Sequence, residues 1–460
     1  MKRLFKGGVV VSGSEIKQAD ILTEGEKILK VEAKISDPEA EIIDAGGKLL
    51  FPGFIDAHTH FDLAVSGTVT ADGFETGTKA AIAGGTTCIV DFATQYHGES
   101  LHDALANWHT KSDGKASCDY GYHLAMADWN DEVCGEMESV VREGITSFKI
   151  YTIYDEMYVD DETIYNVLKK MKELGVIVGV HCENRGLIDA LVKEAKAECP
   201  GEGGVAKFPH TRPDTAEAEA VGRILKLAGY VDVPVMIVHL STQKGYEEIR
   251  RARKTGQKVY AETCPQYLLL NEEKFFQSPT ESRKYVLAPP LRKKEDQEVL
   301  WDALKHGSIQ TISTDHCSFT TEQKAMGAED FSKIPCGMPG VQDRPALMYT
   351  YGVKEGRISL SQMCELLSEN PAKIYGMYPK KGCLLPGSDA DIVVWDPDAE
   401  GVFTCKGQQS LADYHPYEGR KKSGAVEAVY LRGECVARDG AVVKEHAGQF
   451  VKRGKPDFHV

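Results

Sequence analysis

Residues 54–60 read Phe54-Ile55-Asp56-Ala57-His58-Thr59-His60, an apolar run that ends in two histidines. In a β-strand, residues i and i+2 point to the same face, so both imidazoles can reach one metal ion. The pair alone is a weak signal for such a site. Its position gives it weight, because barrel enzymes build their active sites at the carboxyl ends of the strands.

Similar short apolar runs recur along the chain after residue 52, and helix-like segments separate them. This alternation is typical of repeated βα units, which form a parallel sheet, and eight strands close a barrel. The runs span residues 54–56, 87–91, 120–124, 147–150, 176–180, 235–238, 258–262 and 310–313. We therefore predict an α/β fold, a (β/α)8 TIM barrel.

Both ends of the chain show a different sequence pattern, in which brief β-type runs alternate with turns. The runs span residues 9–11, 19–22, 28–31, 41–44 and 48–51 at one end, and 392–395 and 428–431 at the other. We predict that residues 1–51 and 380–460 form one small β-sandwich domain, which the barrel of residues 52–379 interrupts. Two separate lobes are the alternative.

Charge and composition exclude several classes of partner. The formal net charge of -15 argues against nucleic acid, and more weakly against an anionic membrane surface. Twelve cysteines occur singly, without a Cys-x-x-Cys pair, as expected for buried, reduced thiols. No apolar run suits a signal peptide or a membrane span. We expect a soluble, cytoplasmic protein with neither nucleic acid nor membrane as partner.

Four more candidate metal ligands lie at equivalent places on the predicted barrel. Lys149 is in the fourth strand, and the other three directly follow the fifth, sixth and eighth strands. Each has an ordinary structural explanation, such as a hydrogen-bonded core histidine or a helix-capping aspartate. Five segments that deliver ligand types to one rim favour a metal site instead. The candidate ligands are His58, His60, Lys149, His181, His239 and Asp315.

The residues around these candidates carry a resemblance to a known family. Residues 51–60, Phe51-Pro52-Gly53-Phe54-Ile55-Asp56-Ala57-His58-Thr59-His60, resemble the entry signature of the amidohydrolase superfamily. Further matching segments are residues 147–149, 180–184, 238–241, 263–267 and 314–317. Together they resemble the hydantoinase and dihydropyrimidinase family over nearly the full chain. The resemblance implies a barrel with a β-sandwich from both chain ends, and a homotetramer or homodimer.

The resemblance also implies a binuclear metal centre, with zinc as the expected metal and manganese as the alternative. His58, His60 and Asp315 would hold one ion, and His181 and His239 the other. Both ions would share a bridging hydroxide and a carboxylated Lys149 (N6-carboxylysine). An ammonium group cannot bind a cation, whereas a carbamate is an anion that can bridge two ions.

Two catalytic roles follow from the same resemblance. Asp315 would take the proton of the attacking hydroxide and return it to the departing ring nitrogen. Tyr154 matches the family tyrosine that binds substrate and hydrogen-bonds the tetrahedral oxyanion. The implied reaction opens the cyclic amide bond of hydantoins or 5,6-dihydropyrimidines to N-carbamoyl amino acids. An allantoinase is the alternative, and a non-catalytic dihydropyrimidinase-like scaffold protein is an alternative of another class.

The substrate is expected to be a small neutral cyclic ureide or imide. Relatives that act on dihydroorotate place an arginine shortly after the histidine pair, whereas this chain has Phe61-Asp62-Leu63. A substrate carboxylate would meet no cation there. The family binds the imide through main-chain groups, at the positions of Ala288 and Cys336 here. Serine and asparagine are usual at those positions.

Two further features bear on the substrate site. Gln342 occupies a position where the family often has glutamate. An apolar mouth is expected from two loops, residues 62–70 and 153–159. The predicted lining residues are Leu63, Val65, Ile153, Met157 and Val159.

Overall fold

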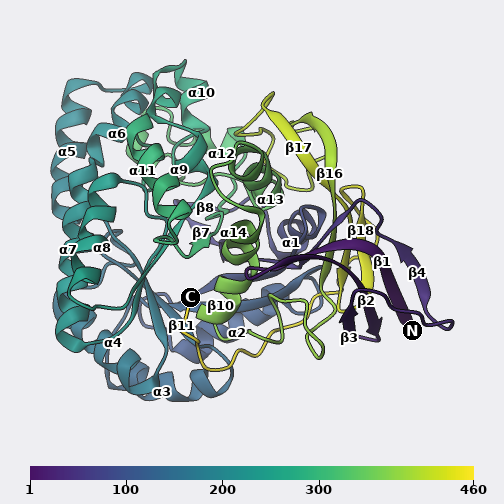
Figure 1. The fold of residues 1–460 in the computed structure, drawn as a ribbon. Helices are drawn as coiled ribbons and strands as arrows, with labels where there is room; N and C mark the ends of the chain where they lie inside the picture. The colour runs from purple at the N-terminus through teal and green to yellow at the C-terminus, as the bar shows by residue number, and fades with distance from the viewer.

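Eight parallel strands form the barrel in the computed structural model, which describes residues 1–460 (Figure 1). Each predicted run overlaps one of them, so the predicted fold class is confirmed. In sheet order the strands are β6 (Phe54–Thr59), β9 (Thr86–Thr94), β10 (Asp119–Ala125), β11 (Ser147–Tyr151), β12 (Ile177–His181), β13 (Val235–Ile237), β14 (Val259–Thr263) and β15 (Thr311–Ile312).

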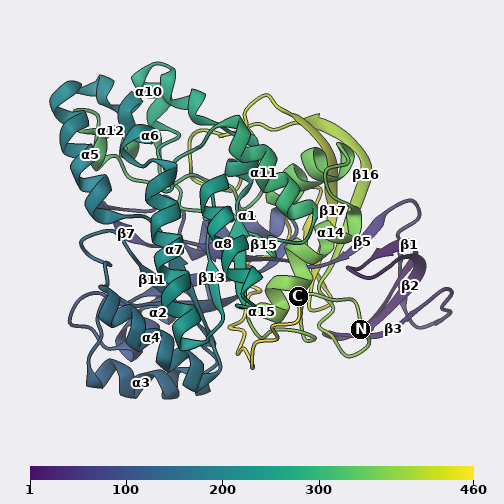
Figure 2. The ribbon, with the colours of Figure 1, turned by 60° about the vertical axis from the view of Figure 1, so that its left-hand side comes forward.

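Helices cover the outside of the barrel, as Figures 1 and 2 show for the teal and green part of the chain. Helix α4 illustrates how they form. The Asp160 side chain accepts a hydrogen bond from Thr163 N at its start, and Gly175 ends it at φ 66°. Its buried stripe includes Ile164, Leu168 and Met171. No helix combines the length and the apolar character of a membrane span.

The longer helices are α1 (Phe74–Ala83), α2 (Leu101–Ser112), α3 (Asp131–Arg142), α4 (Asp161–Leu174), α5 (Arg185–Glu198), α7 (Asp214–Val231), α8 (Gln243–Lys254) and α11 (Lys294–Lys305). Short helices in the loops are α6 (Phe208–Thr211), α9 (Pro265–Leu269), α10 (Pro279–Arg283) and α12 (Thr321–Ala325). Two longer helical stretches contain π-helical turns: α13 (Arg344–Leu347) continues through Met348–Lys354, and α14 (Leu360–Cys364) continues through Glu365–Glu369 into α15 (Asn370–Ile374).

A mixed sheet beside the barrel combines the two ends of the chain. Purple N-terminal strands and yellow C-terminal strands lie side by side in both views (Figures 1 and 2). They meet where β5 pairs antiparallel with β16, from Leu49 opposite Trp395 to Pro52 opposite Ile392. The strands are β1 (Lys2–Val11), β2 (Ile16–Glu24), β3 (Lys27–Glu32), β4 (Glu41–Asp44), β5 (Leu49–Pro52), β16 (Ile392–Val402), β17 (Lys421–Leu431), β18 (Glu434–Arg438) and β19 (Ala441–Val442).

A buried lysine joins this sheet to the barrel. Lys381 Nζ lies 2.6 Å from Asp119 Oδ2, at the start of β10, and 2.7 Å from Asp391 Oδ2, beside β16. Asp389 Oδ2 is 3.1 Å away. Burial opposes the charge on Lys381, but the surrounding carboxylates raise its pKa well above the usual range. The ammonium therefore neutralises a cluster of acids that would otherwise repel one another.

Main-chain and side-chain hydrogen bonds close the barrel between its first and last strands. His60 N donates to His316 O (2.8 Å), and Thr314 Oγ1 donates to Asp56 Oδ2 (2.7 Å). The fully buried Arg344 donates through Nη1 to Ile55 O (2.7 Å) in β6 and to Ile312 O (2.8 Å) in β15. This closure sets the end of β6 beside the residues that follow β15.

We predict that Arg344→Met destabilises the barrel, because it leaves Asp56 buried without its cation and two carbonyl groups without a donor. Removing one partner of a buried charged pair costs about 3–5 kcal/mol. Urea denaturation followed by circular dichroism should show the transition at clearly lower denaturant.

Arg251→Met is the matched control, since Arg251 is 68% exposed and pairs only with Glu248 on the same helix. If both variants unfold at the same urea concentration, the proposed closure is not a major source of stability.

Candidate metal centre

The predicted ligands from the first, sixth and eighth strands converge at one end of the barrel. His58 Nε2 lies 3.2 Å and His60 Nε2 3.1 Å from Asp315 Oδ1. Ligand atoms of His58, His239 and Asp315 all lie within 4.8 Å of one another. The ring of His181, the last residue of β12, is 4.5 Å from that of His239 between centroids.

Lys149 lies in the middle of β11 and is buried. Its Nζ is 4.9 Å from the centroid of the Phe92 ring, which also packs on His58 and His60. Burial lowers the pKa of Lys149 to about 8, against the opposing effect of Asp315. A larger fraction of this side chain is therefore neutral amine near neutral pH than in an exposed lysine.

The protonation states of the site suit a cation. Burial lowers the pKa of His58, His181 and His239, so these imidazoles are neutral, the form that binds metal. Burial alone would raise the pKa of Asp315. The electrostatic interaction with His58 and the hydrogen bond from His60 outweigh this effect and lower the pKa to about 2. The carboxylate is therefore ionised at neutral pH.

Unsatisfied buried atoms point to the same conclusion. His58 Nε2, His239 Nδ1 and Lys149 Nζ are buried without a hydrogen-bond partner. Such groups are rare in proteins and costly unless something else satisfies them. A metal ion would satisfy both imidazole nitrogens, so the donor set fits the implied metal.

Two carboxylates behind the histidines determine which ring nitrogen stays free. Glu262 Oε1 lies 2.6 Å from His58 Nδ1, and Glu183 Oε2 lies 2.7 Å from His181 Nε2. Arg212 and His181 lower the pKa of Glu183 against the effect of burial, whereas burial raises the pKa of Glu262 to about 7. Each carboxyl group occupies the nearer nitrogen of its histidine, which leaves the opposite nitrogen of each ring for a metal. Sequence reasoning missed both, although an acidic residue inside a fully buried strand, as at Glu262, was a usable signal.

The backbone is strained at three of the predicted functional residues. Tyr154, His239 and Asp315 have φ values of 75°, 38° and 53°. Non-glycine residues rarely adopt this left-handed region, and such strain concentrates at functional sites. Three of the nine non-glycine residues with positive φ are therefore residues to which the resemblance assigns a role.

Tyr154 lies beside the cluster, with its ring centroid 5.3 Å from that of His181. The guanidinium of Arg212 is 5.7 Å from the Tyr154 ring centroid. Burial raises the pKa of Tyr154 well above the usual value, so its hydroxyl remains a hydrogen-bond donor. Ala288 is buried, in the segment between α10 and α11, and Cys336 is partly buried, in the segment between α12 and α13.

The apolar lining of the mouth is only partly as predicted. Ile153 packs against Ile188 and Ala216, and Val159 belongs to the main core, so these two face inward. Leu63, Val65 and Met157 keep exposed surface. The short hairpin β7 (Ala64–Val65) and β8 (Thr68–Val69) holds the first of these loops.

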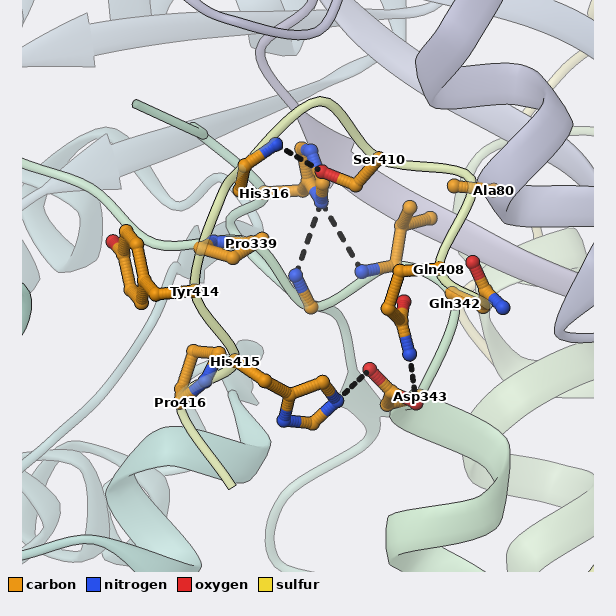
Figure 3. Close-up of a pocket in the computed structure, with 13 residues that line it drawn as sticks. Ala80, His316, Pro339, Gln342, Asp343, Gln408, Ser410, Tyr414, His415 and Pro416 are labelled. Atoms are coloured by element: carbon orange, nitrogen blue, oxygen red, sulfur yellow. Dashed lines mark hydrogen bonds and ion pairs between the residues drawn. The ribbon is translucent and has the colours of Figure 1, made fainter. Parts of the chain in front are cut away.

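Figure 3 shows a small pocket beyond His316, on the side of the C-terminal segment 408–416. His316 Nδ1 accepts from Gly340 N and Val341 N, and Nε2 donates to Asp72 Oδ2 (3.0 Å). These hydrogen bonds use both ring nitrogens of His316, so the histidine beside Asp315 has a structural role. Gln342 Oε1 accepts from Gln409 N (2.9 Å), so this side chain serves the same segment.

Comparisons with known proteins agree with the fold and the ligand pattern. The amidohydrolase family profile matches residues 49–436. D-hydantoinase of Geobacillus stearothermophilus is 44% identical over 459 residues, covering 99% of this chain and 97% of that protein. D-phenylhydantoinase of Escherichia coli O1:K1 / APEC is 38% identical over 460 residues, with 98% of each covered.

Solved structures give the same result. Dihydropyrimidinase from Brevibacillus agri NCHU1002 has a TM-score of 0.97 and 45% identity, with 99% of each chain covered. The chain belongs to the amidohydrolase family. Within it, the protein is a cyclic amidohydrolase of the hydantoinase and dihydropyrimidinase type, which confirms the resemblance.

Replacing either of the supporting carboxylates should weaken metal binding. We expect Glu262→Gln and Glu183→Gln to lower metal affinity about 10–100-fold, because the amide no longer holds its histidine as a carboxylate does. Metal analysis after dialysis against graded chelator measures the change.

Glu217→Gln is the control, since Glu217 is also buried but accepts from Ser241 N (2.8 Å) rather than from a ligand. Equal metal retention in all three variants would contradict the assigned role.

Proposed function

We propose that this protein is a binuclear-metal hydrolase that opens hydantoins or 5,6-dihydropyrimidines to N-carbamoyl amino acids. The observation that carries this proposal is the cluster of His58, His239 and Asp315, with ligand atoms within 4.8 Å. The names of its relatives, D-hydantoinase and D-phenylhydantoinase, favour hydantoins of the D series.

The proposed centre holds two divalent ions. His58, His60 and Asp315 would hold one ion and His181 and His239 the other, and both ions would share a carboxylated Lys149 and a hydroxide. The lowered pKa of Lys149 supports carboxylation, because only the neutral amine reacts with carbon dioxide. Bound divalent ions supply hydroxide near neutral pH and polarise the substrate carbonyl.

Asp315 moves the proton in this mechanism. Its carboxylate is ionised at neutral pH, and Oδ1 faces both His58 and His60. As hydroxide oxygen bonds to the ring carbonyl carbon, Asp315 accepts the hydroxide proton. When the carbon–nitrogen bond breaks, Asp315 returns that proton to the ring nitrogen. One water is consumed, and the ring opens to a carboxylate and a carbamoyl group.

Tyr154 stabilises the charge that develops on the carbonyl oxygen. Its hydroxyl stays protonated, because burial raises its pKa, and it lies beside His181. The strained backbone at Tyr154 holds the donor in place before substrate arrives, which avoids reorganisation during the reaction.

The charges around the site favour a neutral ring. Phe61 is buried, and Asp62 Oδ2 accepts from Phe74 N (2.8 Å) at the start of α1. Arg212 is beside Tyr154, but its guanidinium is 2.5 Å from Glu183 and thus already paired. A substrate carboxylate would have to compete with Glu183 for it.

Further proposals rest on the resemblance. They are zinc, with manganese as the alternative, a homotetramer or homodimer, and a cytoplasmic location. The proposed cytoplasmic location agrees with the twelve free cysteines, because thiols stay reduced in the cytosol. On the same ground we propose that the substrate contacts lie at Ala288 and Cys336. We also propose two domains, one of residues 1–51 with 380–460 and one of residues 52–379.

An assay on five rings tests the function. We expect turnover of hydantoin, 5-phenylhydantoin or dihydrouracil, with D-carbamoyl products from the substituted hydantoin, and none of dihydroorotate. Asp315→Asn should lower kcat about 10²–10⁴-fold, because the proton carrier is lost. Fast hydrolysis of allantoin alone would favour an allantoinase. An Asp315→Asn variant with wild-type activity would contradict the proposed mechanism.

Carboxylation of Lys149 is tested by isotope labelling. Native protein incubated with ¹³C-bicarbonate and zinc should give a carbamate carbon resonance, and Lys149→Gln should give none and bind less zinc. Lys381→Gln is the control, because Lys381 is equally buried but is surrounded by carboxylates. A carbamate signal of the same size in Lys149→Gln would overturn the assignment.

A further inference from the structure

Lys324 is a buried lysine without an acidic partner. It lies on α12 and is 1% exposed. Its ammonium donates to three main-chain carbonyl oxygens, Val286 O at 2.7 Å, Pro335 O at 2.6 Å and Gly337 O at 2.7 Å. Burying an ammonium group away from water is energetically costly, as it is for other buried ions. Such a cost suggests a role beyond filling space.

The three carbonyl groups belong to two loops near the metal centre. Residues 286–288 end at Ala288, and residues 335–337 have Cys336 in the middle; we call them the two substrate loops. Gly337 N donates to Val286 O (3.0 Å), so the loops also contact each other directly. Lys324 thus holds together the two segments in which substrate contacts are proposed.

The ammonium also acts on the chemistry of these loops. Pro335 O and Cys336 N belong to the same peptide unit. A cation on the carbonyl oxygen polarises that unit and makes its N–H a stronger donor. The same contact fixes the direction of the N–H, because the peptide unit is planar.

Close packing at Gly337 also restricts the second substrate loop, residues 335–337. Gly337 adopts φ 149°, and a Cβ there would lie 2.2 Å from Cys317 O. Cys317 N donates to Met338 O (3.2 Å), which ties the loop to the segment that carries Asp315. The hydrogen bonds to Lys324 and the close contact with Cys317 together restrict the movement of residues 335–337.

We propose that Lys324 is a positioning residue, which sets the main-chain groups of the two substrate loops against the ring of the substrate. This inference rests on the proposed function, because it assigns those loops to substrate binding. Lys324 touches neither the metal ligands nor the substrate. It acts through the direction and polarity of the peptide groups. The pKa of Lys324 is lowered to about 8 by burial, so the ammonium still predominates at pH 7.

The test compares Lys324→Met with Lys381→Met in the metal-loaded full-length protein. Lys381 is equally buried, but it lies at the opposite end of the barrel, among carboxylates. We expect Lys324→Met to raise KM for hydantoin or dihydrouracil about tenfold, with kcat changed less than about threefold and metal content unchanged. Lys381→Met should lower the melting temperature and leave KM as in the wild type.

A folded, metal-loaded Lys324→Met with wild-type KM would overturn the inference. An equal loss of kcat together with loss of metal would also overturn it, because it would show a general structural role. If Lys324→Met does not fold, Lys324→Gln decides by the same criteria, since its amide keeps two donors. A wild-type protein that opens none of the rings would overturn the proposed function itself, a result separate from an unchanged KM.

Discussion

The contact between β6 and β15 is the constraint on which the site depends. The last strand is very short, so backbone pairing alone contributes little there. Asp56 and Arg344 complete the contact through hydrogen bonds to main-chain and side-chain groups on both strands. These hydrogen bonds place the end of β6, which carries His58 and His60, beside the segment that carries Asp315. Closure of the barrel therefore also brings the candidate metal ligands together.

Charge is handled differently at the two ends of the barrel. At the start of the strands, Lys381 has carboxylates around it and is satisfied within the protein. At the other end, His58, His239 and Lys149 present atoms with no partner. Carboxylates lie one layer further out, on the far nitrogens of the histidines. The unsatisfied atoms line the candidate metal centre, and the carboxylates behind them hold the histidines in place.

Much of this organisation could be predicted from the sequence, because short continuous apolar runs that alternate with helix-like segments indicate buried parallel strands, and the carboxyl ends of the strands in a barrel lie at one rim. The ligand candidates followed from that rule. Glu183 and Arg212 escaped it, since their roles depend on contacts between distant segments. Ile153 and Val159 were misplaced at the mouth, because an apolar residue in a loop gives no sign of which way it points. Lys324 has the same character: only the folded chain shows three carbonyl groups around its ammonium.

The pairing of β5 with β16 has a consequence for how the protein is made. Leu49 and Trp395 are neighbours in the sheet, yet the ribosome synthesises the whole barrel between them. During translation, one edge of β5 has to wait for its partner strand. Exposed strand edges attract other chains, so the nascent protein passes through a stage at which aggregation competes with folding. A chaperone that shields the early strands would protect that edge until the C-terminal strands emerge.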